Sequence, residues 1–127
     1  MARELNMNGN VKLKTIKQEF NDRFPYLRLS IYASSEKEKS SKTPLDAEKT
    51  ISEVREKKST EPALVRGGQK VKNLEKMIND IFGLYCQVAY TDKDDNRYYT
   101  SGSLDDMSLR DLNEYGEKQG WKKGIWK

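Results

Sequence analysis

The sequence predicts an α/β (α+β) fold in one domain, residues 1–127. Internally duplicated strand-helix-strand-helix units share one mixed sheet of four or five strands, with helices packed on it. Three observations predict this fold. The first half of the chain matches the second, each half has one amphipathic segment with helical spacing, and each such segment precedes alternating apolar residues. A chain of 127 residues is long enough to bury one core.

The match between the halves, which we call the self-match, defines two repeats at about residues 3–58 and 62–118. Residues 5–24 align with residues 63–82 without a gap, and Gly9 then meets Gly67. One residue is dropped afterwards, so that residues 27–31 align with residues 84–88. Identical residues and apolar matches coincide over twenty positions. We therefore expect an internal duplication in which neither repeat is large enough to be stable alone.

The first helix of each repeat is expected at residues 13–24 and 71–82. Pro25 and Gly83 follow directly and favour helix termination there. Short second helices are expected after Thr50 and Ser108, because each of these residues begins a sequence that resembles a capping box. The apolar residues that define the faces of the two long helices are Leu13, Ile16, Phe20, Phe24, Val71, Leu74, Ile78 and Phe82.

Strands are expected before and after each long helix. Such strand–helix–strand units favour parallel neighbours joined by right-handed crossovers. In the second repeat, residues 92–96 are typical of a hairpin turn, and residues 97–100 would add one antiparallel strand. The corresponding part of the first repeat, residues 33–49, is rich in Ser, Lys and Glu, which predicts a mobile, solvated loop.

The composition removes most catalytic chemistries. The chain has no histidine and a single cysteine, Cys86, so serine–histidine and cysteine–histidine nucleophile pairs and the usual zinc sites are excluded. We expect no catalytic residue, no metal and no cofactor. A carboxylate-based hydrolase that uses Asp92, Asp94 or Asp105 with a metal is a third option. The chain start lacks a signal-peptide pattern and no apolar run could span a bilayer, which predicts a cytoplasmic protein without membrane attachment.

Acidic residues form the first candidate site. The sequence Asp92-x-Asp94-x-Asn96 begins like a calcium-binding loop, but Arg97 and Ser103 stand where that loop requires Gly and Glu. A polar hairpin turn is therefore favoured, with an acidic interaction loop as the functional alternative. The residues of that candidate loop are Asp92, Asp94, Asp95, Asp105 and Asp106.

The second candidate site is a basic tail, residues 119–127. It interleaves tryptophan with lysine, a combination that suits single-stranded nucleic acid, because lysine neutralises phosphate while tryptophan stacks on bases. We favour the alternative that the tryptophans fold back onto apolar surface. Only one of Tyr98 and Tyr99 can face the core, so the other is expected on the exposed sheet face. The candidate nucleic-acid contacts are Trp121, Lys122, Lys123, Trp126, Lys127 and Tyr99.

Three stretches resemble those of small uncharacterised bacterial proteins, some of which carry the label "viral A-type inclusion protein repeat". These stretches are Lys70-Val71-x-x-Leu74, Phe82-Gly83-Leu84-x-x-Gln87-Val88 and Leu104-Asp105-Asp106-Met107-Ser108-Leu109. The resemblance covers most of the chain outside the Ser/Lys-rich loop, although those proteins carry tryptophan where this chain has Met107. The label implies no mechanism and no site residues.

The second repeat also resembles ubiquitin-like interaction domains with an acidic loop. The resemblance rests on a strand, a helix that ends at Ile81-Phe82, and a strand that continues into residues 90–95. In such domains the acidic loop binds a basic face of a partner. This chain departs from their pattern at Asn96, where Gly-Asp is usual.

The sequence as a whole predicts a non-enzymatic protein-interaction module whose partner is another protein or a second copy of itself. The alternative is a nucleic-acid-binding protein that uses the basic tail. The net charge of +4 and the pI near 9.1 permit either partner, because basic and acidic residues are interleaved.

Overall fold

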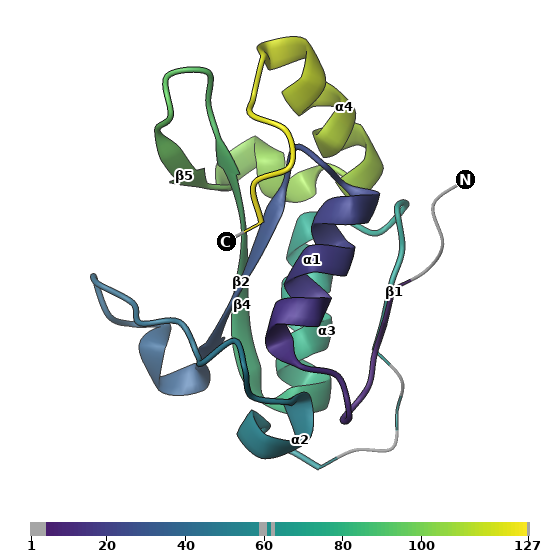
Figure 1. Cartoon of the computed structure of the whole chain (residues 1–127), viewed down its shortest axis with the longest axis vertical. Coiled ribbons are helices and arrows are strands. Elements are labelled where there is room, and N and C mark those ends of the chain that lie inside the picture. Colours follow the sequence, from purple (N-terminus) through teal and green to yellow (C-terminus); the bar gives the residue numbers. More distant parts are fainter. Residues whose placement is uncertain (1–4, 59–60, 62, 127) are drawn as a thin grey trace.

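Two helices, α1 and α3, lie between two small antiparallel sheets (Figure 1). The computed structural model describes residues 5–58, 61 and 63–126. The elements are β1 (Leu5–Met7), α1 (Leu13–Arg23), β2 (Arg28–Ala33), α2 (Ile51–Val54), β3 (Ala63–Val65), α3 (Val71–Phe82), β4 (Leu84–Thr91), β5 (Arg97–Tyr99) and α4 (Leu109–Gln119). Short 3-10 helices occupy Ser34–Glu36 and Gly102–Asp106. The mixed helix and strand content agrees with the predicted α+β class.

The predicted single mixed sheet with parallel neighbours is wrong. One sheet has the order β1-β3 and the other β2-β4-β5, and all of their pairs are antiparallel. The two strands that flank each long helix enter different sheets, and each pairs with a strand from the other half of the chain. The crossover rule applies only when both strands of a unit join the same sheet. It therefore does not govern this fold.

The long helices form as their apolar spacing predicts. Their buried faces contribute Leu13, Ile16 and Phe20 from α1 and Val71, Leu74 and Ile78 from α3, all at most 1% exposed. Helix α3 ends at Gly83, whose φ of 70° suits glycine and not a residue with a Cβ atom. From β4, Leu84, Cys86 and Val88 face the same core and are fully buried.

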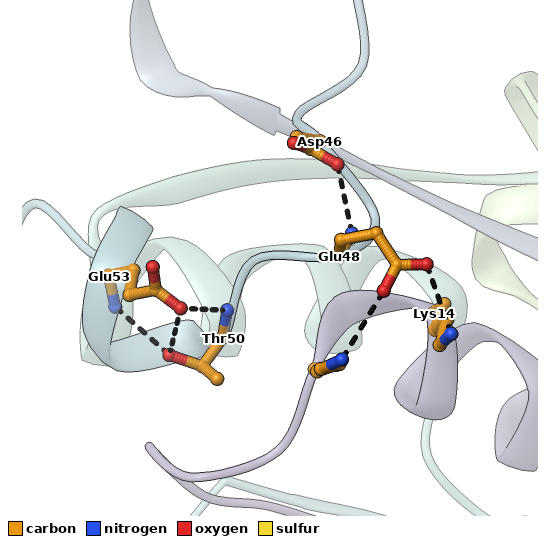
Figure 2. A network of polar contacts seen from close by, with 6 residues as sticks. Lys14, Asp46, Glu48, Thr50 and Glu53 are labelled. Atoms are coloured by element: carbon orange, nitrogen blue, oxygen red, sulfur yellow. Dashed lines mark hydrogen bonds and ion pairs between the residues drawn. The ribbon is translucent and has the colours of Figure 1, made fainter.

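The short helices begin at the predicted caps. Thr50 and Glu53 form a reciprocal capping box at α2, which Figure 2 shows. The Ser108 side chain accepts a hydrogen bond from the backbone N–H of Asp111 at α4. Both predicted helix starts are confirmed. A hydroxyl at this position accepts a hydrogen bond from a backbone N–H group that has no partner within the helix.

The two halves of the chain use the same backbone hydrogen bonds, at positions that are as far apart in the sequence as Gly9 and Gly67 are in the self-match. Leu13 N–H donates to Lys49 at 2.9 Å, and Val71 N–H donates to Met107 at 3.1 Å. In the same way, Ser52 N–H donates to Gly9 and Arg110 N–H donates to Gly67, at 3.0 and 2.9 Å. The isolated bridges Lys12–Thr50 and Lys70–Ser108 are equivalent to each other as well.

The strand registers show the same relation between the halves. In the β1–β3 pair, Asn6 lies opposite Leu64, with which it aligns in the self-match. In the β2–β4 pair, Ser30 lies opposite Gln87, as the one-residue deletion in the second half requires. A two-fold axis between Asn6 and Leu64 and between Ser30 and Gln87 would exchange the equivalent strands of the two halves. The geometry thus relates the first half of the chain to the second.

Residues 33–49 form hydrogen bonds within the segment and with strand β2. The Glu36 carboxylate is buried and accepts a hydrogen bond from Thr43 N–H at 2.9 Å. Leu45 N–H donates to the Ile31 carbonyl on β2 at 3.0 Å. The mobility expected for this segment stays a prediction.

Candidate functional site

The C-terminal tail folds back onto the domain. Trp121 is 8% exposed and stacks on Tyr90, with ring centroids 3.8 Å apart and planes at 9°. Lys122 N–H donates to Thr91, and Gly124 N–H donates to Pro25, both at 2.8 Å. Trp121 is therefore not available for stacking on bases in this structure, as the favoured alternative of a folded-back tail requires.

The other tail residues of the candidate nucleic-acid site are dispersed. The Lys122 ammonium lies 3.6 Å from the Asp95 carboxylate, and Lys123 is exposed. Trp126 is half-buried and lines a pocket beside Lys14 on α1. Lys127 lies outside the described residues.

The five acidic candidates do not form one loop. The Asp92 carboxylate accepts hydrogen bonds from the backbone N–H groups of Asp94 and Asn96, both at 2.9 Å, and so stabilises the hairpin turn. Asp95 has a positive φ of 66° in the same turn. Asp105 and Asp106 lie elsewhere, in the 3-10 helix Gly102–Asp106.

The two later acids have partners of their own. Asp105 accepts a hydrogen bond from the Thr100 hydroxyl at 2.7 Å, and Asp106 lies 2.7 Å from the Lys72 ammonium. Within the described part of the chain, no group of three or more His, Cys, Asp or Glu side chains could hold a metal ion. In that same part, none of the helices is long and apolar enough to cross a membrane.

The expectation that one of Tyr98 and Tyr99 faces the core is wrong. They are 47% and 44% exposed, because β5 is a three-residue edge strand. Tyr98 contacts Tyr90 with ring centroids 5.6 Å apart. The Tyr99 hydroxyl forms a hydrogen bond of 2.9 Å with the Tyr32 hydroxyl on β2.

A basic cluster that the sequence did not reveal comprises Lys17, Arg28 and Arg97. It joins helix α1 to strands β2 and β5. Burial lowers the pKa of Lys17, and the positive charges of Arg28 and Arg97 lower it further. The pKa of Arg28 is lowered by burial and then by Arg97. Each of the three positive charges therefore disfavours the charged form of its neighbours.

The positive charges of this cluster are in a buried environment, which is energetically unfavourable for them. Arg28 is only 5% exposed, and its Nε atom is buried without a hydrogen-bond partner. A buried donor in this state costs about 1–3 kcal/mol. No carboxylate within the described residues forms an ion pair with Lys17 or Arg28. An anionic group from outside the chain would relieve both the repulsion and the unsatisfied donor.

Lys17 also lines a pocket of about 450 Å³, which we call the basic pocket. Its single acid, Glu48, lies between Lys12 and Lys14 at 3.3 and 3.0 Å, and Figure 2 shows its carboxylate directed toward Lys14. Hydrogen bonds from Lys14 and then Lys12 lower the pKa of Glu48. The charge of Lys17 is therefore left unbalanced. The residues that line the pocket are Lys14, Lys17, Gln18, Ala47, Glu48 and Trp126.

A pocket of about 360 Å³ lies at the corresponding place in the second half of the chain, where a glutamate stands among lysines. The self-match aligns Lys14 with Lys72 and Lys17 with Glu75. The Lys14–Glu48 ion pair likewise corresponds to the Lys72–Asp106 pair. The same frame thus carries a lysine in one half and a glutamate in the other. The residues that line the pocket are Lys37, Lys72, Glu75, Lys76, Asn79 and Tyr85.

Glu75 is in an unfavourable setting for a carboxylate. Burial and then the negative charge of Asp105 raise its pKa to about 7, although a backbone hydrogen bond from Val88 and the charge of Lys37 oppose the rise. Asp105 has no acidic counterpart in the basic pocket, because Ala47 precedes Lys49 by two residues as Asp105 precedes Met107, and Lys49 and Met107 accept equivalent backbone hydrogen bonds. Part of this contrast was visible in the sequence, where Lys17 aligns with Glu75.

No family model matches the chain, and neither the curated proteins nor the solved structures contain a match. The two resemblances drawn from the sequence therefore stay expectations.

Cys86 is fully buried, and burial raises the pKa of its thiol, so that it is suited to packing and not to nucleophilic chemistry.

Proposed function

We propose that this protein is a non-enzymatic interaction module that binds an acidic protein surface through the basic cluster. One observation carries the proposal: Lys17 and Arg28 are desolvated, repel each other, and form no ion pair with a described carboxylate. Such an arrangement is unfavourable for the isolated protein. A carboxylate-bearing partner would turn this repulsion into attraction and would gain specificity from it.

We also propose that the scaffold arose by internal duplication and that the protein acts in the cytoplasm. The shared hydrogen bonds and registers of the two halves support the duplication. Duplication explains why one frame appears twice, with apolar positions retained and exposed positions changed. The single buried Cys86 is consistent with a reducing compartment.

A fluorescent hexaglutamate peptide tests the binding site directly. We expect the wild-type protein to bind it with an affinity that falls as salt rises. Lys17→Glu should weaken binding by about tenfold or more, equivalent to ~1.4 kcal/mol. Lys58→Glu is the matched control, because Lys58 is exposed and lies after α2, outside the cluster. Equal loss in both variants, or no binding even at low salt, would contradict the proposal.

Single-stranded nucleic acid is the second candidate partner. Tyr99 favours it, because this exposed aromatic ring lies close enough to Arg28 to influence the guanidinium. Bases stack on exposed aromatic side chains while cations neutralise the phosphates. The variant Tyr99→Ala separates the candidates. It should reduce oligonucleotide binding several-fold if nucleic acid is the partner, and leave hexaglutamate binding unchanged if a protein is.

A further inference from the structure

We propose that the basic cluster binds a phosphate monoester, carried on a phosphorylated side chain of the partner protein, at the outer face of the β2-β4-β5 sheet. This inference rests on the proposed function, because it names the acidic group that the cluster would bind. The outer face is the one turned away from α1 and α3, and Figure 1 shows the 3-10 helix Ser34–Glu36 on that side of the sheet.

The strand register determines which residues lie on the outer face. Side chains alternate between the two faces of a strand, and the core takes Leu29 of β2 and Val88 of β4. The residues between these core positions therefore point the other way. The outer face comprises Arg28, Ser30 and Tyr32 of β2, Tyr85, Gln87, Ala89 and Thr91 of β4, and Arg97 and Tyr99 of β5.

Two buried polar atoms of this face have no hydrogen-bond partner. They are the Nε donor of Arg28 and the Oε1 acceptor of Gln87, and among the described residues only Oε1 of Gln69 is in the same state. Gln87 lies opposite Ser30, so it is a diagonal neighbour of Arg28 across the two strands. Long side chains at this spacing reach each other. A ligand that accepts from Arg28 and donates to Gln87 would satisfy both atoms.

A pocket of about 350 Å³ lies beside these atoms, and we call it the sheet-face pocket. The Tyr99 hydroxyl is positioned there by its hydrogen bond of 2.9 Å to Tyr32. Burial and then the charge of Arg97 lower the pKa of Arg28, while Tyr99 and Tyr32 oppose the fall, so Arg28 lies close to the pocket as well. The residues that line the pocket are Ser40, Ser41, Lys42, Gln87 and Tyr99.

The charge of the site favours a dianion. Its cations come from separate elements, with Lys17 on α1, Arg28 on β2 and Arg97 on β5. A phosphate monoester carries a charge of about −1.5 to −2 at pH 7 and three acceptor oxygens on one group. It can therefore contact several converging cations at once, whereas a carboxylate brings one charge and two oxygens. Arginine in particular binds phosphate through two parallel hydrogen bonds.

The unpartnered acceptor of Gln87 favours a peptide as the carrier of the phosphate. A phosphate dianion only accepts hydrogen bonds, so the donor for Gln87 has to come from another part of the ligand. The backbone N–H groups beside a phosphorylated residue provide such donors. Ser40 and Ser41 are exposed, so a chain can approach the pocket from solvent. A phosphodiester of nucleic acid fits less well, because it carries a single charge per phosphate.

Fluorescence anisotropy with three matched heptapeptides tests the inference. Their central residue is phosphoserine, aspartate or serine, and the flanking residues are all glycine, so only the central group differs. The wild type should bind the phosphoserine peptide about tenfold or more tightly than the aspartate peptide, equivalent to ~1.4 kcal/mol. The serine peptide should bind more weakly than either. Equal affinity for the phosphoserine and aspartate peptides would overturn the inference.

Two variants test the residues of the site. Arg28→Lys keeps the charge and removes the planar guanidinium, so it should abolish the preference for phosphoserine and leave hexaglutamate binding unchanged. Gln87→Leu removes the acceptor and should weaken binding of the phosphoserine peptide several-fold. Arg110→Lys is the matched control, because Arg110 is exposed and lies on α4. A preference for phosphoserine that survives both Arg28→Lys and Gln87→Leu would overturn the inference.

Circular dichroism should show native helix content for each variant. If Arg28→Lys fails to fold, Arg97→Lys makes the same exchange at an exposed position of the cluster and should also reduce the preference. Inorganic phosphate identifies the source of the phosphate group. It should displace the phosphoserine peptide only at concentrations well above the Kd of that peptide, because it lacks the flanking backbone. Displacement at equal concentration would overturn the peptide in favour of a small phosphate ligand.

The outcomes separate this inference from the proposed function. A protein that binds hexaglutamate through Lys17 and does not prefer phosphoserine overturns the phosphate site and leaves the interaction module in place. A protein that binds neither ligand overturns both. Binding of single-stranded oligonucleotides in preference to the phosphoserine peptide and hexaglutamate overturns both in favour of nucleic acid. A preference for phosphoserine that depends on Arg28 and Gln87 supports the inference.

Discussion

The first and second halves of the chain share a backbone frame and differ in the charges that the frame displays. Equivalent hydrogen bonds join equivalent positions, such as Leu13 to Lys49 and Val71 to Met107. On the same frame, Lys17 of one half stands where the other half has Glu75. The comparison shows that apolar positions and helix caps determine the shared backbone structure, while half-exposed positions can carry different charges in the two halves.

The halves also differ in how they end. Helix α2 has four residues and α4 has eleven, and only α4 leads into a tail that returns to the domain. That tail contacts the first half through Asn21, whose side-chain amide donates to the Pro25, Leu27 and Ile125 carbonyls. The tail thus packs against both halves of the chain. Its removal should lower the stability of the fold more than it lowers binding.

The largest expected effect comes from Trp121, which has no counterpart in the first half. We expect Trp121→Ala to lower the free energy of unfolding by about 3–5 kcal/mol, because it removes the stacked contact with Tyr90 and the edge contact with Tyr115. Chemical denaturation monitored by circular dichroism measures the change. A loss below about 1 kcal/mol would mean that the tail does not pack as described.

A second variant tests the same contact from its other side. A Cβ atom built on Gly116 would lie too close to the Trp121 ring for both to keep their places. Gly116→Ala should therefore cost about 1–3 kcal/mol in the wild type. In the Trp121→Ala background the same change should be neutral or stabilising, because alanine favours helix. An equal cost in both backgrounds would contradict the packing.

An intermediate effect on stability is expected from removal of the helix caps. Thr50 and Ser108 occupy equivalent positions, so their variants allow a direct comparison of the two halves. Thr50→Ala removes a reciprocal capping box, whereas Ser108→Ala removes one hydrogen bond of 3.1 Å. Each should cost about 1 kcal/mol, and the Thr50 variant should cost more. Denaturation midpoints of both variants measure the difference. Thr50→Ser and Ser108→Thr keep the hydroxyl and should behave like the wild type. The reverse order would show that α2 contributes little.

The smallest expected effect is a pH dependence from Glu75, a position at which the first half carries Lys17 instead. The folded pKa of Glu75 is raised to about 7, so the folded state binds its proton more tightly than the unfolded state does. Stability from this group is present below its ordinary pKa of 4.5 and is lost as pH rises toward 7. With allowance for its partial exposure, Glu75→Gln should raise the Tm by about 2–4 °C at alkaline pH.

The same variant should give no gain in acid. Below the ordinary pKa of a glutamate, both the wild type and Glu75→Gln carry a neutral side chain at this position, and their melting temperatures should agree. Thermal unfolding of both proteins measures the difference at each pH. A Tm gain that is the same in acid and in base would show that Glu75 does not titrate differently in the folded state.

The long helices were predictable because their signals are local. The apolar spacing of residues such as Ile16 and Leu74 and the glycine after α3 depend only on neighbours in the chain. Strand pairing was not predictable in the same way. Each strand that flanks a long helix pairs across the two halves, and the sequence distance to that partner is longer than the distance to the other strand of its own unit. The rule for adjacent strands therefore gave the wrong sheet.

The candidate sites show the same limit. Asp92 was correctly placed in a hairpin turn, because the preference of aspartate for turns is local. The basic cluster was missed because Arg28 and Arg97 are far apart in sequence, and strand β4 lies between their strands. The Lys17–Glu75 contrast was present in the self-match, but its importance depends on the burial of both side chains.

The sequence by itself determined the helices and their caps, the hairpin turn and the core faces, because each follows from the order of apolar, polar and turn-forming residues along a short stretch. The tertiary structure alone decided which strands pair, that Tyr90 is the ring on which Trp121 stacks, and that Lys17 and Arg28 lie close together without an acid. These features depend on distances between segments that are remote in sequence. Charge and burial at such meeting points are set by the fold as a whole.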